Sequence, residues 1–518
     1  MRTLTLTGDA LTVEDLVAVA RGQARAVLGD QVAARMETSR QVVADAVEQG
    51  RVMYGVTTGF GALADTHIGR GDLERMQLAL VRSHAAGVGQ PLDDQTVRAL
   101  LLLRARTLTA GYSGVRVELP ARLLELLELG LLPVVPGKGS VGASGDLAQL
   151  AHLALPLVGE GRLRTTKDTD PWGRPAAEVL AEAGLSPIQL GPKEGLSLLN
   201  GTEPMQALLA FSVADAELLC KVADIGCALA VEGLLGTDRP YDPRVQVIRP
   251  HPGQLASASN LRRLLHASPL VASHRESDHA VQDSYCLRCA PQVHGAVRDV
   301  VAHARRVITT ELGAVVDNPV IVTGLDGVGH EVMSTGNFHG EPLAFAGDML
   351  AIAVSELASI SERRIDRMLD PAFSRDLPPF LAAEPGTNSG YMLAQYTAAS
   401  LVSENKVLAH PSSVDTIPTS GNQEDHVSMG WTSQRKLREV LENVRIVLAV
   451  EILTSCQAVD FRAETAGPSP ATAAVYERVR EVVPSMLVDR HVGDQIDAVT
   501  ALLPELVERA EAVTGTLD

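Results

Sequence analysis

Residues 136–153 read Pro-Gly-Lys-Gly-Ser-Val-Gly-Ala-Ser-Gly-Asp-Leu-Ala-Gln-Leu-Ala-His-Leu, and they contain the most informative feature of the chain, the tripeptide Ala143-Ser144-Gly145. Because glycine has no Cβ, the amide nitrogen of Gly145 can approach the carbonyl carbon of Ala143 and close a five-membered ring. Loss of water from that ring and from the Ser144 side chain would leave an exocyclic methylidene, an electrophile that no ordinary side chain supplies. The tripeptide is therefore a candidate for a prosthetic group made from the backbone itself.

The same stretch allows two other interpretations. Ser144 is a suitable N-cap for the helix that follows, with Asp146 in the first turn against the helix dipole. Gly137, Gly139 and Gly142 also spell G-x-G-x-x-G after an apolar stretch, as in a dinucleotide-binding fingerprint. That fingerprint needs alternating strands and helices around it, whereas long helices follow here. An NAD-dependent dehydrogenase is therefore a minor alternative, and we expect no NAD.

The composition favours a large, mainly helical enzyme. The 518 residues suffice for a large buried core, and they are 46% hydrophobic but only 3% aromatic. Such a core is built mostly from Leu, Val and Ala, which suits long packed helices better than aromatic-rich strands. The formal net charge of −18 argues against a nucleic-acid partner, because the phosphates would be repelled.

The charged residues and the cysteines of the chain indicate its cellular location and the redox state of its thiols. No stretch reaches the roughly 18 uncharged apolar residues of a membrane span. Asp9, Glu14 and Asp15 break the apolar run that a secretory signal would need, so we expect a cytoplasmic protein with no membrane partner. Five cysteines are too few for a disulfide framework, and Cys286-x-x-Cys289 lacks the second ligand pair of a zinc site. We expect free thiols.

The pattern of apolar residues in the sequence changes after about residue 204. Apolar residues then recur at helical spacing in four stretches, 205–236, 292–315, 343–369 and 431–459. Helices of this size would be about 35–45 Å long and would pack side by side as a bundle. Small aliphatic residues on their surfaces favour oligomerisation. The expected fold is mainly α, with an N-terminal mixed domain at 1–204 that carries the tripeptide, a long-helix bundle with active-site loops at 205–483, and C-terminal capping helices at 484–518.

Reactive side chains gather in four further loops. Tyr54 lies in the glycine-rich segment 54–61, and His84 lies in the segment 83–89. Gln282, Tyr285 and Arg288 are spaced so that one turn or irregular loop can present an amide, a phenol and a guanidinium to one ligand. Glu424 lies in the polar segment 421–429. Taken singly, all of these residues except Arg288 are explained as well by structural roles.

Metal ligation is a further alternative. Glu424, Asp425 and His426 are potential ligands, but adjacent residues cannot easily converge on one ion. His339-Gly-Glu341 matches no familiar ligand spacing. We therefore expect no metal.

Together with the tripeptide, these segments resemble the histidine/phenylalanine ammonia-lyase family, and its histidine-specific branch in particular. The resemblance runs from about residue 52 to 430. It includes, in matching order, Leu199-Asn-Gly-Thr202, Asp317-Asn-Pro319, Gly336-Asn-Phe-His-Gly-Glu-Pro342 and Ser361-Glu-Arg-Arg364. Several independent motifs in one order make the resemblance highly specific, and they favour the prosthetic group over a helix cap at Ser144.

The resemblance implies a mostly helical homotetramer whose active sites are built from several subunits. It implies that Ala143, Ser144 and Gly145 cyclise autocatalytically to 4-methylidene-imidazol-5-one. Catalytic roles fall on Tyr54, as the base that removes the β-proton of the substrate, and on Tyr285 and Glu424.

The remaining roles concern substrate binding. The resemblance places Arg288 at the substrate carboxylate, which suits its planar, bidentate fork. It places Asn200 and Phe338 beside the electrophile, and Gln282 in the surrounding hydrogen-bond network.

The choice of substrate depends on His84 and Glu424. Both can form hydrogen bonds to an imidazole ring, whereas a phenyl ring would leave them buried without partners. The resemblance therefore implies elimination of ammonia from L-histidine to give trans-urocanate, a step of histidine degradation. The alternative is a tyrosine or phenylalanine ammonia-lyase, or an aminomutase, that uses the same prosthetic group.

Overall fold

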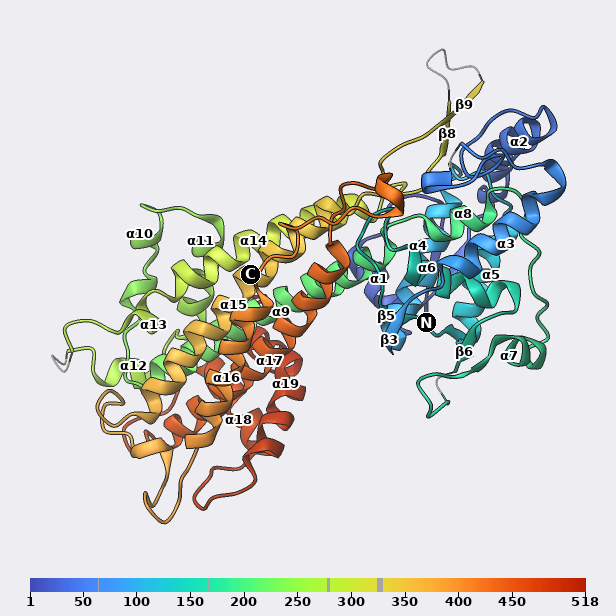
Figure 1. The fold of residues 1–518 in the computed structure, drawn as a ribbon. Coiled ribbons are helices and arrows are strands. Elements are labelled where there is room, and N and C mark those ends of the chain that lie inside the picture. Colours follow the sequence, from blue (N-terminus) through green and yellow to red (C-terminus); the bar gives the residue numbers. More distant parts are fainter. Residues whose placement is uncertain (64, 166, 277–279, 324–328) are drawn as a thin grey trace. The chain divides into compact units, whose positions relative to one another are not determined.

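The computed structural model describes residues 1–63, 65–165, 167–276, 280–323 and 329–518 (Figure 1). These residues divide into two compact units. Unit 1 comprises Met1–Phe211, Arg305–Gly347 and Pro411–Arg435, and unit 2 comprises Ser212–Ala304, Asp348–His410 and Lys436–Asp518. Neither unit is contiguous in sequence, so the division into three consecutive domains stays a prediction about chain segments.

Unit 1 combines short helices with small sheets (Figure 1). Its helices are α1 (Val13–Ala20), α2 (Val32–Glu48), α3 (Leu73–His84), α4 (Asp94–Thr109), α5 (Glu118–Leu129), α6 (Leu147–Ala154), α7 (Ala176–Glu182) and α8 (Glu194–Leu199). Its strands are β1 (Arg2–Leu6), β2 (Ala24–Leu28), β3 (Val88–Pro91), β4 (Leu132–Pro133), β5 (Pro136–Lys138), β6 (Arg162–Arg164), β7 (Arg174–Pro175), β8 (Val320–Thr323) and β9 (His330–Met333). Strands β1 and β2 are parallel, whereas β3–β5, β4–β6, β6–β7 and β8–β9 are antiparallel pairs.

Helix α4 forms the core of unit 1. The Asp93 side chain caps it by accepting the Thr96 N–H at 2.9 Å, and the helix is buried along almost its whole length. Helices α1, α2 and α5 pack against it. Its Arg98 donates to the Ala20 carbonyl at 3.1 Å and to the Leu127 carbonyl at 3.3 Å. These carbonyls belong to the last turns of α1 and α5, so one arginine ties three helices together.

Four long helices confirm the pattern predicted from the sequence. They are α9 (Glu203–Gly233), α14 (Ala290–Glu311), α15 (Glu341–Leu369) and α17 (Gly430–Asp460). Most of each lies in unit 2, together with α16 (Met392–Leu408), α18 (Pro470–Val482) and α19 (Val492–Thr514). The shorter helices of unit 2 are α10 (Pro243–Gln246), α11 (Pro252–Leu264), α12 (Pro269–Ser273) and α13 (Tyr285–Arg288). The prediction of a mainly α fold is correct.

A buried ion pair organises the bundle of unit 2. Arg364 on α15 donates to Glu451 on α17 at 3.0 Å, and both side chains are fully buried. The Ser361 hydroxyl donates to the same carboxylate at 2.6 Å. A Cβ at Gly226 on α9 would lie only 3.0 Å from the Glu451 carboxyl carbon, so α9 can approach this closely because it has glycine there. Loss of one charge would leave the other buried and uncompensated.

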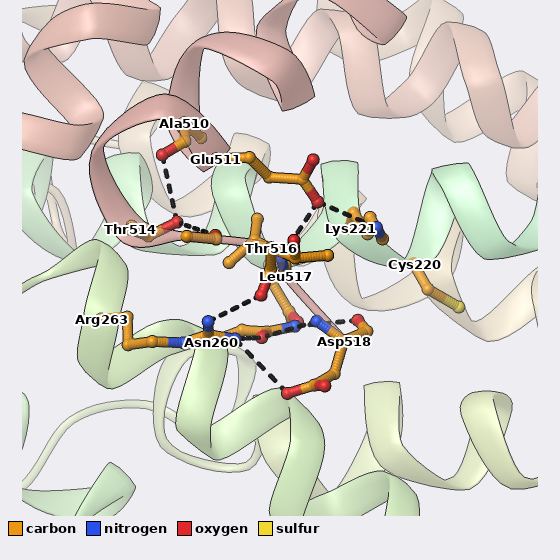
Figure 2. A network of polar contacts seen from close by, with 12 residues as sticks. Cys220, Lys221, Asn260, Arg263, Ala510, Glu511, Thr514, Thr516, Leu517 and Asp518 are labelled. Carbon is orange, nitrogen blue, oxygen red and sulfur yellow. Dashed lines mark hydrogen bonds and ion pairs between the residues drawn. The ribbon is translucent and has the colours of Figure 1, made fainter.

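The C-terminal residues pack back onto unit 2 through a second polar network (Figure 2). Asn260 on α11 accepts from the Asp518 amide and donates to the Asp518 carbonyl, both at 3.1 Å. Glu511 on α19 accepts from Lys221 on α9 at 2.9 Å and from the Leu517 amide at 3.0 Å. Leu517 lies between these bonds and is itself buried. The polar bonds and this apolar side chain together connect α9, α11 and α19.

Helix α15 is, among the described residues, the one helix long and apolar enough to pass a length-and-composition test for a membrane span. In its most apolar window, 61% is buried inside the protein. Asp348 and Glu356 interrupt its apolar residues. These features are those of a core helix, which passes the same test.

Glu232 on α9 offers a test of this packing through pH. Burial raises the pKa of its carboxyl from the usual 4.5 to about 7, although the hydroxyls of Ser268 and Thr472 and the Ser469 amide donate hydrogen bonds to it. Because the folded-state pKa lies above the unfolded one, this group stabilises the fold fully below about pH 4.5, and the contribution is lost as the pH rises through 7.

We expect Glu232→Gln, which preserves the shape of the neutral acid, to flatten the decline of stability between about pH 5 and 7 by up to about 1.4 kcal/mol per pH unit. Thermal unfolding across a pH series measures this effect. Glu508→Gln, at an exposed position of α19, is the matched control. Identical pH profiles for the two variants would show that Glu232 does not titrate in this range.

Candidate active site

A cavity of about 350 Å³ in unit 1 brings together five of the residues singled out in the sequence. These residues are Tyr54, His84, Ser144, Asn200 and Glu424. Much of the remaining wall is apolar and comes from α3 and α8, including Met76, Leu80, Leu196 and Leu199. A few polar groups therefore converge in a mainly apolar cavity, which is the usual character of a small-molecule site.

The backbone next to Ser144 is held in conformations that only glycine tolerates. Gly145 has a φ of +72°, and a Cβ there would lie 1.9 Å from the Gly201 carbonyl oxygen. Gly142 has a φ of +69°, and a Cβ there would lie 2.2 Å from the Ser428 hydroxyl. The tripeptide thus lies in a cradle with no room for side chains on either of these glycines. This environment suits the close backbone approach that cyclisation needs.

The other side of the tripeptide is apolar. Ala143 is buried and packs with Val427 and Met429, with Val141 at the edge of the cluster. The Met429 amide donates to the Val141 carbonyl at 2.9 Å, so the segment after Glu424 is bonded directly to the segment before the tripeptide.

The interpretation of Ser144 as a helix cap is wrong. Helix α6 begins at Leu147 and its N-cap residue is Asp146, which makes no side-chain cap bond. The Ser144 hydroxyl instead lies 3.4 Å from a Glu424 carboxylate oxygen, to which it donates. The glycine fingerprint also lacks its context, because β5, which carries Gly137, pairs with β3 in an antiparallel sheet.

Asp146 has a role that the sequence did not reveal. Its carboxylate accepts from the Ser140 hydroxyl at 2.6 Å and from the Met205 amide at 3.1 Å, rather than standing in the first turn of a helix. Burial raises the pKa of this carboxyl to about 7, against the effect of those two hydrogen bonds. A group that exchanges protons near neutral pH therefore adjoins Gly145. In the sequence it could not be told from an ordinary helix-start aspartate.

The Tyr54 loop is anchored at several points. The Tyr54 phenol oxygen accepts the Gly61 N–H at 3.0 Å. Gln77 on α3 is fully buried; its amide donates to the Gly55 carbonyl at 3.1 Å and accepts the Leu196 N–H at 3.0 Å. Gln77 therefore joins the Tyr54 loop to α8. Nothing in the sequence marked it, because an isolated glutamine in a helix has no distinctive pattern.

His84 and Glu424 both present hydrogen-bond acceptors. His84 Nδ1 lies 2.9 Å from the Leu80 carbonyl, so the neutral ring carries its proton on Nδ1 and leaves Nε2 as an acceptor. Burial lowers the pKa of His84, against the opposing effects of Leu80 and Glu424, which keeps the ring neutral at neutral pH. Glu424 is oriented by the Thr419 hydroxyl, which donates to its second oxygen at 2.9 Å.

Asn200 is fixed through its backbone. Arg104 on α4 donates to the Asn200 carbonyl at 2.9 Å and pairs with Glu203 at 3.2 Å; both charged side chains are fully buried. The Asn200 side-chain oxygen is buried and accepts no hydrogen bond from any described residue. Arg104 thereby fixes the backbone of Asn200, while the side-chain oxygen of Asn200 stays available to a ligand.

Six predicted site residues do not line this cavity: Ala143 and Gly145, which flank the lining residue Ser144, and Gln282, Tyr285, Arg288 and Phe338. Phe338 belongs to unit 1 but is only half-buried and is not part of the wall. Gln282, Tyr285 and Arg288 belong to unit 2, where Tyr285 is 72% exposed and the Arg288 guanidinium lies 4.6 Å from its ring centre. The wall of this cavity thus contains Ser144 and the two acceptors, but not the predicted carboxylate-binding arginine.

The family profile for aromatic amino acid lyases matches residues 11–481. The chain belongs to this family. It is similar to the histidine ammonia-lyase of Anaeromyxobacter sp. (strain K), with 50% identity over 509 residues that cover 98% of this chain and 99% of that protein. The resemblance inferred from the motifs is therefore confirmed, and the chain is a carbon–nitrogen lyase.

Solved structures agree with this assignment. The histidine ammonia-lyase from Trypanosoma cruzi has 42% sequence identity and a TM-score of 0.90, over 99% of this chain and 96% of that one. The tyrosine aminomutase from Streptomyces globisporus has 37% identity and a TM-score of 0.92, over the whole of both chains. Because proteins with different named reactions share the fold, the substrate has to be argued from side chains.

We expect Gln77→Leu to loosen the Tyr54 loop, because the change leaves two buried backbone groups unpaired at a cost of about 1–3 kcal/mol each. Hydrogen exchange of residues 53–58 should become faster than in the parent protein, and the melting temperature should fall. Gln41→Leu, at an exposed position of α2, is the control and should change neither. Unchanged exchange in Gln77→Leu would mean that other contacts hold the loop.

Proposed function

We propose that this protein eliminates ammonia from L-histidine to give trans-urocanate. The observation that carries the proposal is the presence of His84 and Glu424 beside Ser144 in the wall of one cavity. The identity of about half the residues to a histidine ammonia-lyase along nearly the full chain supports it.

We infer that Ala143, Ser144 and Gly145 form the prosthetic group 4-methylidene-imidazol-5-one. When formed, the group supplies an electrophile that withdraws electrons from the substrate and so makes its nitrogen a better leaving group. The residues present fit it, because Gly145 adopts a left-handed conformation in close contact with Gly201, which restricts the backbone to a narrow range of conformations. Asp146, the residue after Gly145, is buried with a raised pKa of about 7 and is bonded to the Ser140 hydroxyl and the Met205 amide, so it is a candidate to hold or release a proton during cyclisation.

The other cavity residues act on the substrate. Tyr54 faces the cavity with its phenol, and the Gly61 N–H is placed to stabilise negative charge on that oxygen. This arrangement suits a base that removes the β-proton. The apolar wall excludes water and strengthens each polar contact with the bound amino acid.

The two acceptors distinguish histidine from an apolar substrate. An imidazole ring protonated on both nitrogens offers two N–H donors, and His84 Nε2 and the Glu424 carboxylate can each accept one. A phenyl ring offers none and would leave both acceptors without partners. A tyrosine or phenylalanine lyase or aminomutase remains the second candidate, because a tyrosine aminomutase shares the fold.

We propose further that the enzyme is a cytoplasmic homotetramer with active sites shared between subunits. Gln282, Tyr285 and Arg288 belong to unit 2 and are not part of the cavity wall in unit 1, and the family resemblance implies that other subunits supply part of each active site. Unit 2 also exposes large apolar side chains on two helices. They are Met349 and Ile352 on α15, and Leu393, Tyr396 and Val407 on α16. Exposed apolar surface of this kind marks protein–protein contact.

The function is tested by supplying L-histidine alone and following urocanate absorbance and ammonia release. We expect turnover by the parent protein, a loss of at least about 10³-fold in Ser144→Ala, and no loss in Ser334→Ala, at an exposed serine of unit 1. Comparison with L-tyrosine and L-phenylalanine at matched concentration tests the substrate. Faster turnover of either aromatic amino acid, or formation of a β-amino acid, would contradict the proposal.

Shared active sites are tested by co-expressing two inactive variants, Tyr54→Phe and Arg288→Ala. If one subunit supplies Tyr54 and another supplies Arg288, random assembly pairs the two intact halves in up to about a quarter of the sites. We therefore expect mixed tetramers to recover measurable activity that neither variant has alone. No recovery in tetramers shown to contain both variants would place both residues in the same subunit.

A further inference from the structure

Three side chains with metal-ligand chemistry meet in unit 1 outside the cavity. They are His339, just before α15, Glu341, the first residue of α15, and His426, in the loop before α17. One donor atom from each lies within 4.8 Å of the other two. The His339 and His426 ring centres are 5.7 Å apart. The sequence alone does not show that these residues lie close together, because the two segments are far apart in the chain and neither contains a complete ligand set.

The hydrogen bonds of His339 fix its tautomer. Nε2 lies 3.2 Å from the His426 carbonyl oxygen and must donate to it. In a neutral ring, Nδ1 then carries a lone pair, which faces the Glu341 side of the cluster. A metal-binding histidine typically donates its second ring nitrogen to a backbone carbonyl in this way, which holds the ring in place.

Glu341 provides the second indication of a ligand. One of its carboxylate oxygens is buried and accepts no hydrogen bond from any described residue. The same oxygen lies 3.9 Å from His339 Nδ1. A buried carboxylate oxygen without a donor is costly, so a positive partner at this point would relieve it.

A structural role for His339 explains only part of this geometry. The Glu341 amide donates to His339 Nδ1 at 3.3 Å, which satisfies one of the unpaired N–H groups at the start of α15. That contact leaves the carboxylate oxygen of Glu341 unpaired. The amide can bond to water instead when Nδ1 takes another partner, because first-turn N–H groups have no partner within the helix.

We propose that His339, Glu341 and His426 bind one divalent cation of the zinc class. Two imidazoles and one carboxylate are a known zinc ligand set that leaves a position open for water. Bonds of about 2.1 Å to a tetrahedral ion place donor atoms about 3.4 Å apart, so the present spacing, which is within 4.8 Å, has to contract by up to about 1.4 Å. His426 is exposed and is free to make that movement.

The cation would join the segment that holds His339 and Glu341 to the segment that carries the cavity residue Glu424. His339 follows Phe338 directly, and His426 lies two residues after Glu424. Beyond His426, the Ser428 hydroxyl donates to the Gly142 carbonyl at 3.2 Å, next to the tripeptide. Binding would therefore fix the segment 338–341 to the segment 424–429, which contacts the backbone next to the tripeptide. This proposal goes beyond the reaction and does not depend on the substrate.

The test is a calorimetric titration of chelator-treated protein with zinc chloride, together with thermal unfolding with and without zinc. We expect one equivalent per chain and a higher melting temperature with zinc. Binding should weaken at least tenfold in His339→Ala, His426→Ala and Glu341→Gln. His330→Ala, at an exposed histidine of β9, and Glu356→Gln, at an exposed position of α15, are matched controls and should bind as the parent does.

Circular dichroism of the zinc-free variants shows whether each is folded. If His339→Ala does not fold, Glu341→Gln and His426→Ala decide the question, because the first keeps its size and the second is at the surface. Absence of zinc binding in the parent overturns the proposal. So does binding that is unchanged in these variants, which would point to the Cys286–Cys289 pair or other groups.

Discussion

The contact between Gly145 and Gly201 is the constraint on which the candidate site depends. The two residues form a parallel bridge, and the Asp146 amide donates to the Gly201 carbonyl at 2.9 Å. No side chain fits between them, so the backbone of the tripeptide packs directly against the backbone of the segment that carries Asn200. Arg104 and its buried partner Glu203 hold the second segment in place, and Ser428 and Met429 hold the first.

Burial governs the chemistry of the groups around this contact. Asp146 is pressed toward the neutral form, with its pKa near 7, and His84 is kept neutral by the same desolvation. Glu424, by contrast, receives hydrogen bonds from Thr419 and Ser144. A buried imidazole that carries its proton on Nδ1, a carboxylate that accepts from two hydroxyls and the Tyr54 side chain therefore line one mainly apolar cavity.

The sequence predicted the long helices well, because their apolar residues repeat over many turns. The ends of α9, α14, α15 and α17 lie within a few residues of the predicted stretches. Motif order was equally informative, and it identified every polar group that lines the cavity next to Ser144 except Ser83 and Ser420.

What the sequence did not predict depends on contacts between distant segments. The Gln77 side chain acts through two hydrogen bonds and the Thr419 hydroxyl through one, and such contacts leave no periodic pattern in the sequence. Asp146 looked like an ordinary helix-start residue. The assignment of Gln282, Tyr285 and Arg288 to a different unit from the cavity is also invisible in motif order. The meeting of His339 and Glu341 with His426 is of the same kind, since it exists only after folding.

The central claim is that the backbone at residues 143–145 closes on itself and dehydrates. Mass spectrometry of the proteolytic peptide that contains these residues tests it most directly, with the peptide from Ser144→Ala as reference. We predict that the parent peptide is lighter than its sequence mass by two water molecules, while the variant peptide lacks the two-water deficit. A parent peptide of full mass from protein that turns over its substrate would contradict the account.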